Sequence, residues 1–369
     1  MNVDARVEAW ASLQLLPGLG ARNLVTLLKH FGGPLELRAA ARKRIAALAS
    51  AEVAAAIERG PDPSLLERTL EWLREPGHRL VAWDDADYPP ALLDITDPPP
   101  AFYYVGRPEL LTRDAVAIVG SRNATPQGVE HAQAFAAALS AAGFTIVSGL
   151  AVGIDAAAHR GGLSGAASSL AVVGTGLDRI YPAGNRDLAQ RLASEGGMLS
   201  EFALGTPPLP ENFPRRNRLI SGLARGVLVV EATLNSGSLI TARLAGEQGR
   251  EVFAIPGSIH SPFSKGAHRL IREGAKLVET AQDVLEELGM HTEPTAMGTG
   301  REPITRRGPL PEEGSAARVL AALGHDPAGI DLLARRTGLS AESITVALVE
   351  LEVAGRVVSL PGGLYQRRD

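Results

Sequence analysis

The sequence predicts an α/β protein built on a doubly wound, mostly parallel sheet, with a helical domain before it and a small winged-helix domain after it. Two observations predict the sheet. Short, almost continuously apolar runs recur through the middle of the chain, and longer alanine-rich segments with helical spacing separate them. Strands that are apolar on both sides are typical of a parallel sheet covered by helices on both faces.

The N-terminal residues 1–85 are rich in alanine, leucine and arginine with helical spacing, which predicts a helical domain. Within it, LLPGLGARN (15–23) resembles the Pro-Gly-x-Gly turn of helix-hairpin-helix modules, whose backbone N–H groups can hold a DNA phosphate. Such glycine turns are common between helices, so a plain connection is favoured over a DNA contact. The proline-rich run at 84–100 then breaks any helix, since proline lacks the N–H donor and restricts its predecessor.

The central domain is predicted to span residues 86–289, and a segment of linker composition follows at 290–314. Its strand candidates are AFYYVG (101–106), AVAIVG (115–120), FTIVSG (144–149), SLAVVG (169–174), GMLSE (197–201), GVLVVEA (226–232) and EVFAIPG (251–257). Helix-like segments lie between most of them.

Residues 315–369 are predicted to form the winged helix, from three helical segments and the two-stranded pattern VVSL-PGG-LYQR. Its presumed recognition helix, AESITVALVELEVAG, carries Glu342, Glu350 and Glu352 and neither lysine nor arginine. Because phosphates flank the major groove, an acidic helix is repelled there. We expect this domain to bind protein or to regulate.

Composition narrows the function classes. Of the 369 residues, 45% are hydrophobic and 21% charged, as in folded globular proteins. No apolar run reaches the length of a membrane span, and MNVDARVEAW does not read as a signal peptide, so we expect a cytoplasmic protein. Without cysteine, and with scattered histidines, we expect neither a metal nor a cofactor. A net charge of -4 still permits one local basic groove.

Small residues follow the predicted parallel strands. In a doubly wound sheet, ligands bind beyond the carboxyl ends of the strands, where helix N-termini present free N–H groups. Glycine, serine and asparagine let a phosphate approach those groups closely. They are common in any strand-to-helix turn, but their recurrence at one rim predicts an anion-binding edge. The candidates are Ser121, Gly149, Asn235, Ser236, Gly237 and Ser238.

A basic cluster lies in ENFPRRNRLISGLARGVLVV (211–230), where Arg215, Arg216 and Arg218 precede a predicted strand. Pro214 can occupy the first turn of a helix, which leaves its neighbours near the positive end of that helix. A single basic run is usually a solvated face. The concentration of positive charge at a sheet rim nevertheless predicts a negatively charged ligand.

Two further cations, Arg122 and Lys265, follow other strands and are predicted to converge on the same rim. A row of phosphate-sized turns with several cations favours a polyanion. Single-stranded nucleic acid fits, because its phosphates are regularly spaced and its bases can stack on side chains. Phe213 beside the arginines could stack on a base, although a core position is favoured.

Catalytic constellations are weaker. There is no GxxxxGK[ST] motif, and GTGLDR carries Arg179 where the dinucleotide fingerprint needs its third glycine. Asp155 and His159 share a helix face and could form an acid/base pair, but a local surface pair is favoured. Glu201 and Glu231 end predicted strands, where a hydrolase can have a general base. Neither carboxylate is accompanied by other potential metal ligands.

These stretches together resemble the DNA-processing protein A family (DprA, also called Smf). The matching stretches run in order over roughly 115–280: VAIVGSRNAT, IVSGLAVGIDAAAHRGGL, VVGTGLDRIYPAGNRDLA, GMLSEFALGTPP, NFPRRNRLISGLA, VLVVEATLNSGSLITARLAGEQGREVFAIPGS and GAHRLIREGAKLV. The flanking domains are also similar, the first to a sterile-alpha-motif or helix-hairpin-helix domain and the last to a winged helix.

The resemblance implies an extended Rossmann-like domain that binds single-stranded DNA in a positive pocket, without known catalysis. It implies a homodimer that loads the RecA recombinase onto incoming DNA in natural transformation, helps displace single-strand-binding protein, and serves repair as a further role. Helices near 239–248 and 281–288 are the expected dimer contact.

Carried over by motif, Arg122 should grip phosphate, and Arg215, Arg216 and Asn217 should line the pocket. The resemblance assigns a helix N-terminus to Ser236, Gly237 and Ser238, and a basic position to Lys265. Where the family often has asparagine, this chain has His268, which leaves the role of that loop open and could make binding sensitive to mild acid.

Two alternatives remain. A Rossmann-like nucleotide hydrolase of the lysine-decarboxylase-like type would use the same rim for a mononucleotide phosphate. Such proteins have a PGGxGT turn with a following glutamate, whereas the PGG of this chain (361–363) lies in the wing. A pure protein-interaction scaffold would make Arg215 and Arg216 dispensable for DNA affinity.

Overall fold

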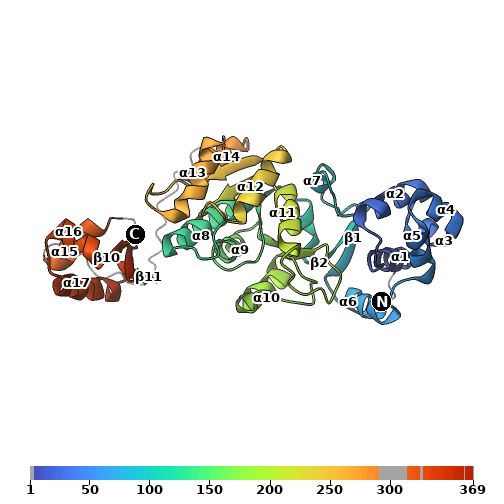
Figure 1. The fold of residues 1–369 in the computed structure, drawn as a ribbon, viewed down its shortest axis with the longest axis horizontal. Helices are drawn as coiled ribbons and strands as arrows, with labels where there is room; N and C mark the ends of the chain where they lie inside the picture. The colour runs from blue at the N-terminus through green and yellow to red at the C-terminus, as the bar shows by residue number, and fades with distance from the viewer. Residues whose placement is uncertain (1–3, 291–313, 325–326, 361, 369) are drawn as a thin grey trace. The chain divides into compact units, whose positions relative to one another are not determined.

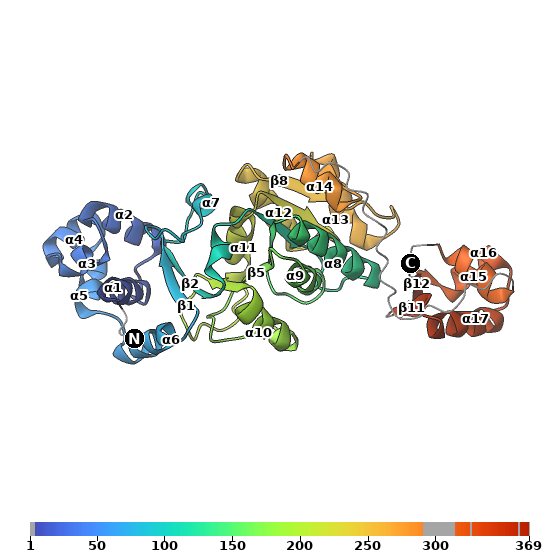
Figure 2. The same ribbon diagram turned by 180° about the vertical axis from the view of Figure 1, so that it is seen from behind.

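The computed structural model describes residues 4–290, 314–324, 327–360 and 362–368. The chain divides into two compact units. The first comprises Met1–Ala124, Gly128–Pro256 and Pro262–Gly289, and the second comprises Thr125–Gln127, Gly257–Ser261 and Met290–Asp369. Figures 1 and 2 show the ribbon from opposite sides. The predicted linker at 290–314 lies almost entirely outside the described residues.

The N-terminal helices of the first unit are α1 (Ala5–Gln14), α2 (Ala21–Phe31), α3 (Pro34–Ala39), α4 (Arg42–Leu48), α5 (Ala51–Arg59) and α6 (Pro63–Arg74). Side chains cap three of them, because Asp4, Ser50 and Asp62 each accept a hydrogen bond from a first-turn N–H. The predicted glycine turn joins α1 to α2, with Gly18 in the left-handed region at φ 82°.

The sheet of the first unit has nine strands in the order β1-β2-β6-β5-β4-β3-β7-β8-β9. They are β1 (His78–Ala82), β2 (Ala101–Gly106), β3 (Ala115–Val119), β4 (Thr145–Ser148), β5 (Ser169–Val172), β6 (Gly197–Ser200), β7 (Gly226–Val229), β8 (Glu251–Ala254) and β9 (Lys276–Leu277). From β6 to β9 all neighbours are parallel, while β2 runs antiparallel to β6 and to β1. The doubly wound, mostly parallel sheet is therefore confirmed, with all seven predicted strands.

β1 and β9 were not among the predicted strands. β1 places Leu80 in the core of the helical domain and Val81 in the core of the sheet, so the β1–β2 hairpin faces both. β1 follows the helical domain and is joined to β2 without a full crossover helix, so it lacks the strand–helix alternation on which the prediction depends. The domain boundary after residue 85 falls just beyond this strand and stays a prediction.

Helices cover both faces of the parallel strands. They are α8 (Pro126–Ala141), α9 (Ile154–Ser164), α10 (Arg186–Glu195), α11 (Asn212–Leu223), α12 (Ser238–Glu247), α13 (Lys265–Arg272) and α14 (Ala281–Glu287). Shorter turns are α7 (Pro90–Leu93), η1 (Pro108–Leu111), η2 (Ala183–Asn185) and η3 (Pro262–Ser264). Along β5, Leu170 and Val172 belong to the core on the α11 side of the sheet, whereas Ala171 belongs to the core that contains α9 and α10. This alternation is the physical basis of a sheet buried on both sides.

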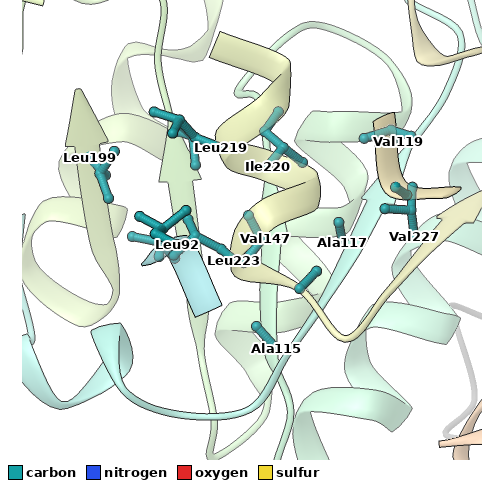
Figure 3. Packing of buried hydrophobic residues seen from close by; sticks show 14 of the residues in the cluster. Leu92, Ala115, Ala117, Val119, Val147, Leu199, Leu219, Ile220, Leu223 and Val227 are labelled. Carbon is teal, nitrogen blue, oxygen red and sulfur yellow. The ribbon is translucent and has the colours of Figure 1, made fainter. Parts of the chain in front are cut away.

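Helix α11 matters most for the site. Figure 3 shows Leu219, Ile220 and Leu223 of α11 lying over the strands that carry Ala117 and Val147, and all five side chains are buried. Burial of this apolar face fixes the helix against the sheet. The polar N-terminal turn of α11 is thereby held at the carboxyl ends of the strands.

The second unit contains the winged helix, as predicted. Its elements are α15 (Ser315–Leu323), β10 (Ala328–Gly329), α16 (Ile330–Thr337), α17 (Ala341–Val353), β11 (Val357–Leu360) and β12 (Leu364–Arg367), with strand order β10-β12-β11. A core around Val319, Leu333 and Leu348 holds the three helices together. Among the described residues of either unit, no helix has both the length and the apolar character needed to cross a membrane.

Candidate nucleic-acid interface

A cavity of 680 Å³ lies at the carboxyl ends of the parallel strands, where the strand order reverses at β3. Ligands of doubly wound folds bind at this switch point. The loops after β3, β4 and β7 and the N-terminal turn of α11 line it. The lining includes Ser121, Arg122, Asn123, Ala151, Asp155, Tyr181, Pro208, Pro210, Phe213, Pro214, Arg216, Asn217, Thr233, Ser236, Gly237, Ser238 and Phe263.

Arg122, in the turn after β3, is an exposed cation of this cavity. Its guanidinium carbon lies 5.8 Å from the centre of the Phe213 ring, within the range of a cation–π contact. Among the described residues Arg122 forms no ion pair. A cation–π contact of this kind does not use the N–H groups of the guanidinium as hydrogen-bond donors. They can therefore bind a phosphate in a bidentate manner.

Arg216, by contrast, is a buried cation, with only 5% of the residue exposed. Its Nη1 donates to the carbonyl oxygen of Gly149 at 2.8 Å and also to that of Val172. Burial lowers the pKa of Arg216 to about 10, while Asp155 acts in the opposite direction. At neutral pH the guanidinium therefore stays charged and forms a fixed positive floor to the cavity.

Gly149 has a different role from the one expected. Its N–H donates to the Oδ2 of Asp155 at 3.1 Å, so it is not directed at the cavity. A Cβ at this position would lie 2.6 Å from Nη1 of Arg216. Gly149 thus makes room for the buried guanidinium, and a direct phosphate contact from its N–H group has no geometric support.

Asp155 and His159 were expected to form a local surface pair, which is wrong because both are buried. Nε2 of His159 accepts from the Leu150 N–H at 3.2 Å, and Nδ1 lies 2.7 Å from the Ser169 hydroxyl. That hydroxyl donates to the Ile146 carbonyl, so Nδ1 is the donor to serine and the imidazole is neutral. Burial, reinforced by Arg216, lowers the pKa of His159 to about 3. The pair shapes the loop after β4 and offers no accessible acid or base.

Arg215 lies apart from the cavity lining and turns toward the end of β6. Its Nη2 is 3.1 Å from Oε2 of Glu201, whose side chain is only 4% exposed, and half of the arginine remains exposed. The same carboxylate oxygen lies 2.6 Å from Arg218. Burial raises the pKa of Glu201, and the two arginines act in the opposite direction. The carboxylate is therefore buried and paired, which does not suit a general base. Arg215 offers a second positive point beside the cavity.

The start of α12 borders the cavity through Ser236, Gly237 and Ser238. The two serine hydroxyls lie 2.6 Å apart, and the Ser236 hydroxyl accepts from the Ser238 N–H at 3.3 Å. Asn217 also lines the cavity. Asn235 lines an adjoining hollow between α12 and α13, and Lys265 opens α13 as an exposed residue outside the lining. The structure thus gathers most of the predicted residues at one rim.

Two aromatic side chains at the cavity differ from expectation. Phe213 was favoured as a core residue, but it is only half-buried and lines the cavity beneath Arg122. Tyr181, which the sequence reasoning missed, is 45% exposed and its ring centre lies 5.7 Å from that of Phe213. The available signal was an aromatic residue in a glycine-rich loop after a buried strand.

Comparison with known proteins supplies the family. The family model of DNA recombination-mediator protein A matches residues 79–289, and the DprA winged-helix model matches residues 303–363. The chain belongs to the DNA recombination-mediator protein A family. Protein Smf of Escherichia coli K12 is 44% identical over 309 residues, which cover 82% of this chain and 81% of that protein. DNA processing protein DprA of Streptococcus pneumoniae R6 is 48% identical over 203 residues, or 55% of this chain and 72% of that protein.

Solved structures agree with this family assignment. DNA processing protein A of Streptococcus pneumoniae superposes with a TM-score of 0.68 at 37% identity, covering 78% of this chain and 99% of that one. DNA processing protein A of Helicobacter pylori gives a TM-score of 0.53 at 31% identity, covering 58% of this chain and 98% of that one. The latter structure is described as giving insight into a single-stranded DNA binding mode.

Proposed function

We propose that this protein binds single-stranded DNA at the switch-point cavity and acts as a recombination mediator. The observation that carries the proposal is Arg122, an exposed cation in the cavity lining without an ion-pair partner among the described residues. Its guanidinium carbon lies 5.8 Å from the centre of the Phe213 ring. A guanidinium beside an aromatic ring places a phosphate-binding group next to an apolar surface. Single strands present phosphates and unpaired bases together. The Helicobacter pylori relative, whose structure concerns single-stranded DNA binding, supports the same ligand.

The mediator role has further parts. We propose that a homodimer, formed through α12 and α14, loads RecA onto incoming strands in natural transformation, displaces single-strand-binding protein, and acts in repair. We also propose that the protein acts without catalysis. His159 is buried in its neutral form, and the carboxylate of Glu201 is bound by two arginines. Both groups are buried, so neither is accessible to a bound strand as an acid or a base.

The first experiment measures binding of fluorescent oligo-dT, and of a duplex of the same length, at several salt concentrations. The Arg122→Ala variant should weaken binding and flatten the log–log salt dependence by about 0.7 for each phosphate that the protein no longer neutralises. Arg191→Ala is the matched control, because that exposed arginine pairs with Glu195 on α10 and does not line the cavity. An unchanged slope in the Arg122 variant would contradict phosphate binding at this residue.

A further inference from the structure

The cavity carries a row of three flat groups: the guanidinium of Arg122, the ring of Phe213 and the ring of Tyr181. We infer that Tyr181 is a stacking platform for one unpaired base, and that this contact gives the cavity its preference for single strands over duplex. The inference rests on the proposed function. It adds a specificity-determining residue to a site whose charged groups by themselves do not distinguish the two forms of DNA.

Phe213 is less suited to this task than Tyr181. Arg122 lies over the Phe213 ring, and the edge of the ring packs so closely on Gly174 that a Cβ there would lie 3.1 Å from Cδ1. The centres of the two rings are 5.7 Å apart, with planes inclined at 42°. At this separation the two rings are in direct aromatic contact, which leaves no room for a base between them. The exposed side of Tyr181 can accept a base without displacing Arg122 from Phe213.

Tyr181 has the surface that such a contact requires. It is 45% exposed, it lines the cavity, and among the described residues its hydroxyl forms no hydrogen bond. A single exposed aromatic residue is unremarkable on a protein surface. What distinguishes Tyr181 is its place one ring away from an unpaired cation, so that phosphate and base can be bound side by side.

The loop that carries Tyr181 is held in place before any ligand arrives. Asp178 accepts from the Gly205 N–H at 2.8 Å, and the Gly176 N–H donates to the Thr206 carbonyl at 3.1 Å. The Asn185 side chain donates to the Leu150 carbonyl at 2.9 Å. The loop is thus tied on both sides. A preorganised ring loses little conformational entropy on binding, which favours stacking.

Selectivity for single strands follows from the difference between paired bases in a duplex and unpaired bases in a single strand. In a duplex they are already stacked and paired, and extracting one costs a few kcal/mol. In a single strand, an unpaired base can stack directly on the ring of Tyr181. Phosphates are present in both forms, so Arg122 contributes to both. Removing the tyrosine ring should therefore lower affinity for single strands alone.

The test combines Tyr181→Ala and Tyr181→Phe with oligo-dT and an oligo-dT that carries one abasic position, moved along the strand. We expect Tyr181→Ala to weaken single-strand binding about ten-fold, within the range for one base–aromatic contact. Its salt slope and its duplex affinity should stay as in the wild type, and Tyr181→Phe should bind normally. At one position base removal should weaken the wild type but not the alanine variant.

A spectroscopic measurement adds an independent readout. A 2-aminopurine placed at the sensitive position should lose fluorescence on binding the wild type and Tyr181→Phe, and keep it with Tyr181→Leu, which retains an apolar side chain. Equal losses of affinity for single strand and duplex, or the same base-removal penalty in wild type and alanine variant at every position, would overturn the inference while leaving the proposed function intact. Failure of the wild type to bind any single strand would overturn both.

Discussion

Gly149→Ala tests the buried floor of the cavity. The new Cβ would lie 2.6 Å from Nη1 and 2.8 Å from Cζ of Arg216, which no real Cβ tolerates. The guanidinium must shift, and its hydrogen bonds to the carbonyls of Gly149 and Val172 weaken. Overpacking costs about 1–3 kcal/mol, and each hydrogen bond to a charged group contributes about 1.5–3 kcal/mol. Partial loss of both gives a destabilisation of about 3 kcal/mol.

The assay is thermal unfolding of the larger unit, followed by circular dichroism, beside Gly184→Ala. Gly184 has no atom within 4 Å of a built Cβ and an ordinary φ, so this control should change stability by less than about 0.5 kcal/mol. Gly149→Ala should lower the Tm by about 6–12 °C. In an Arg216→Met background the same glycine change should cost much less, because the clashing group is gone. Equal effects at the two glycines, or additive effects with Arg216→Met, would refute the reasoning.

Further outcomes are expected elsewhere. Deleting residues 315–369 should leave most single-strand affinity intact, because α17 carries three glutamates and no basic residue. A large loss of affinity in a filter-binding assay would show that this domain contributes to DNA binding. Glu201→Gln should cost about 1.5–3 kcal/mol in urea unfolding, since the buried Arg218 loses its charged hydrogen-bond partner and keeps only the exposed Asp97, 3.4 Å away. A cost below about 1 kcal/mol would contradict that role. The pKa of His159 is about 3 in the folded state and about 6.5 in the unfolded state. Between these two pH values the unfolded state binds more protons than the folded state. The contribution of His159 to stability is full above about pH 6.5 and is lost as the pH falls toward 3. Burial raises the pKa of Asp155, which changes the pH dependence of stability in the opposite direction. The difference between the Tm–pH curves of the wild type and His159→Gln isolates the contribution of the histidine. Superimposable curves would disprove that contribution.

The sequence by itself determined the order of the elements along the chain. Runs such as AVAIVG and GVLVVEA predicted strands buried on both faces, and the helices between them predicted parallel neighbours. The parallel pairing of β3 with β7 confirms both expectations. The small residues after the strands and the winged helix were also predicted from the sequence, whereas the strand order, and with it the position of the switch point, came from the structure. The predicted features are local and repetitive, so a linear pattern records them.

Only the tertiary structure decided which side chains face the ligand. Arg215 and Arg216 are neighbours in the sequence, yet one is half-exposed against Glu201 and the other is buried under Gly149. Successive residues of a helix point about 100° apart, so what each one meets depends on loops distant in the sequence. The pairing of Tyr181 with Phe213 likewise joins two separate segments. Packing between remote segments sets burial, hydrogen-bond partners and charge state, and none of these is written in local spacing.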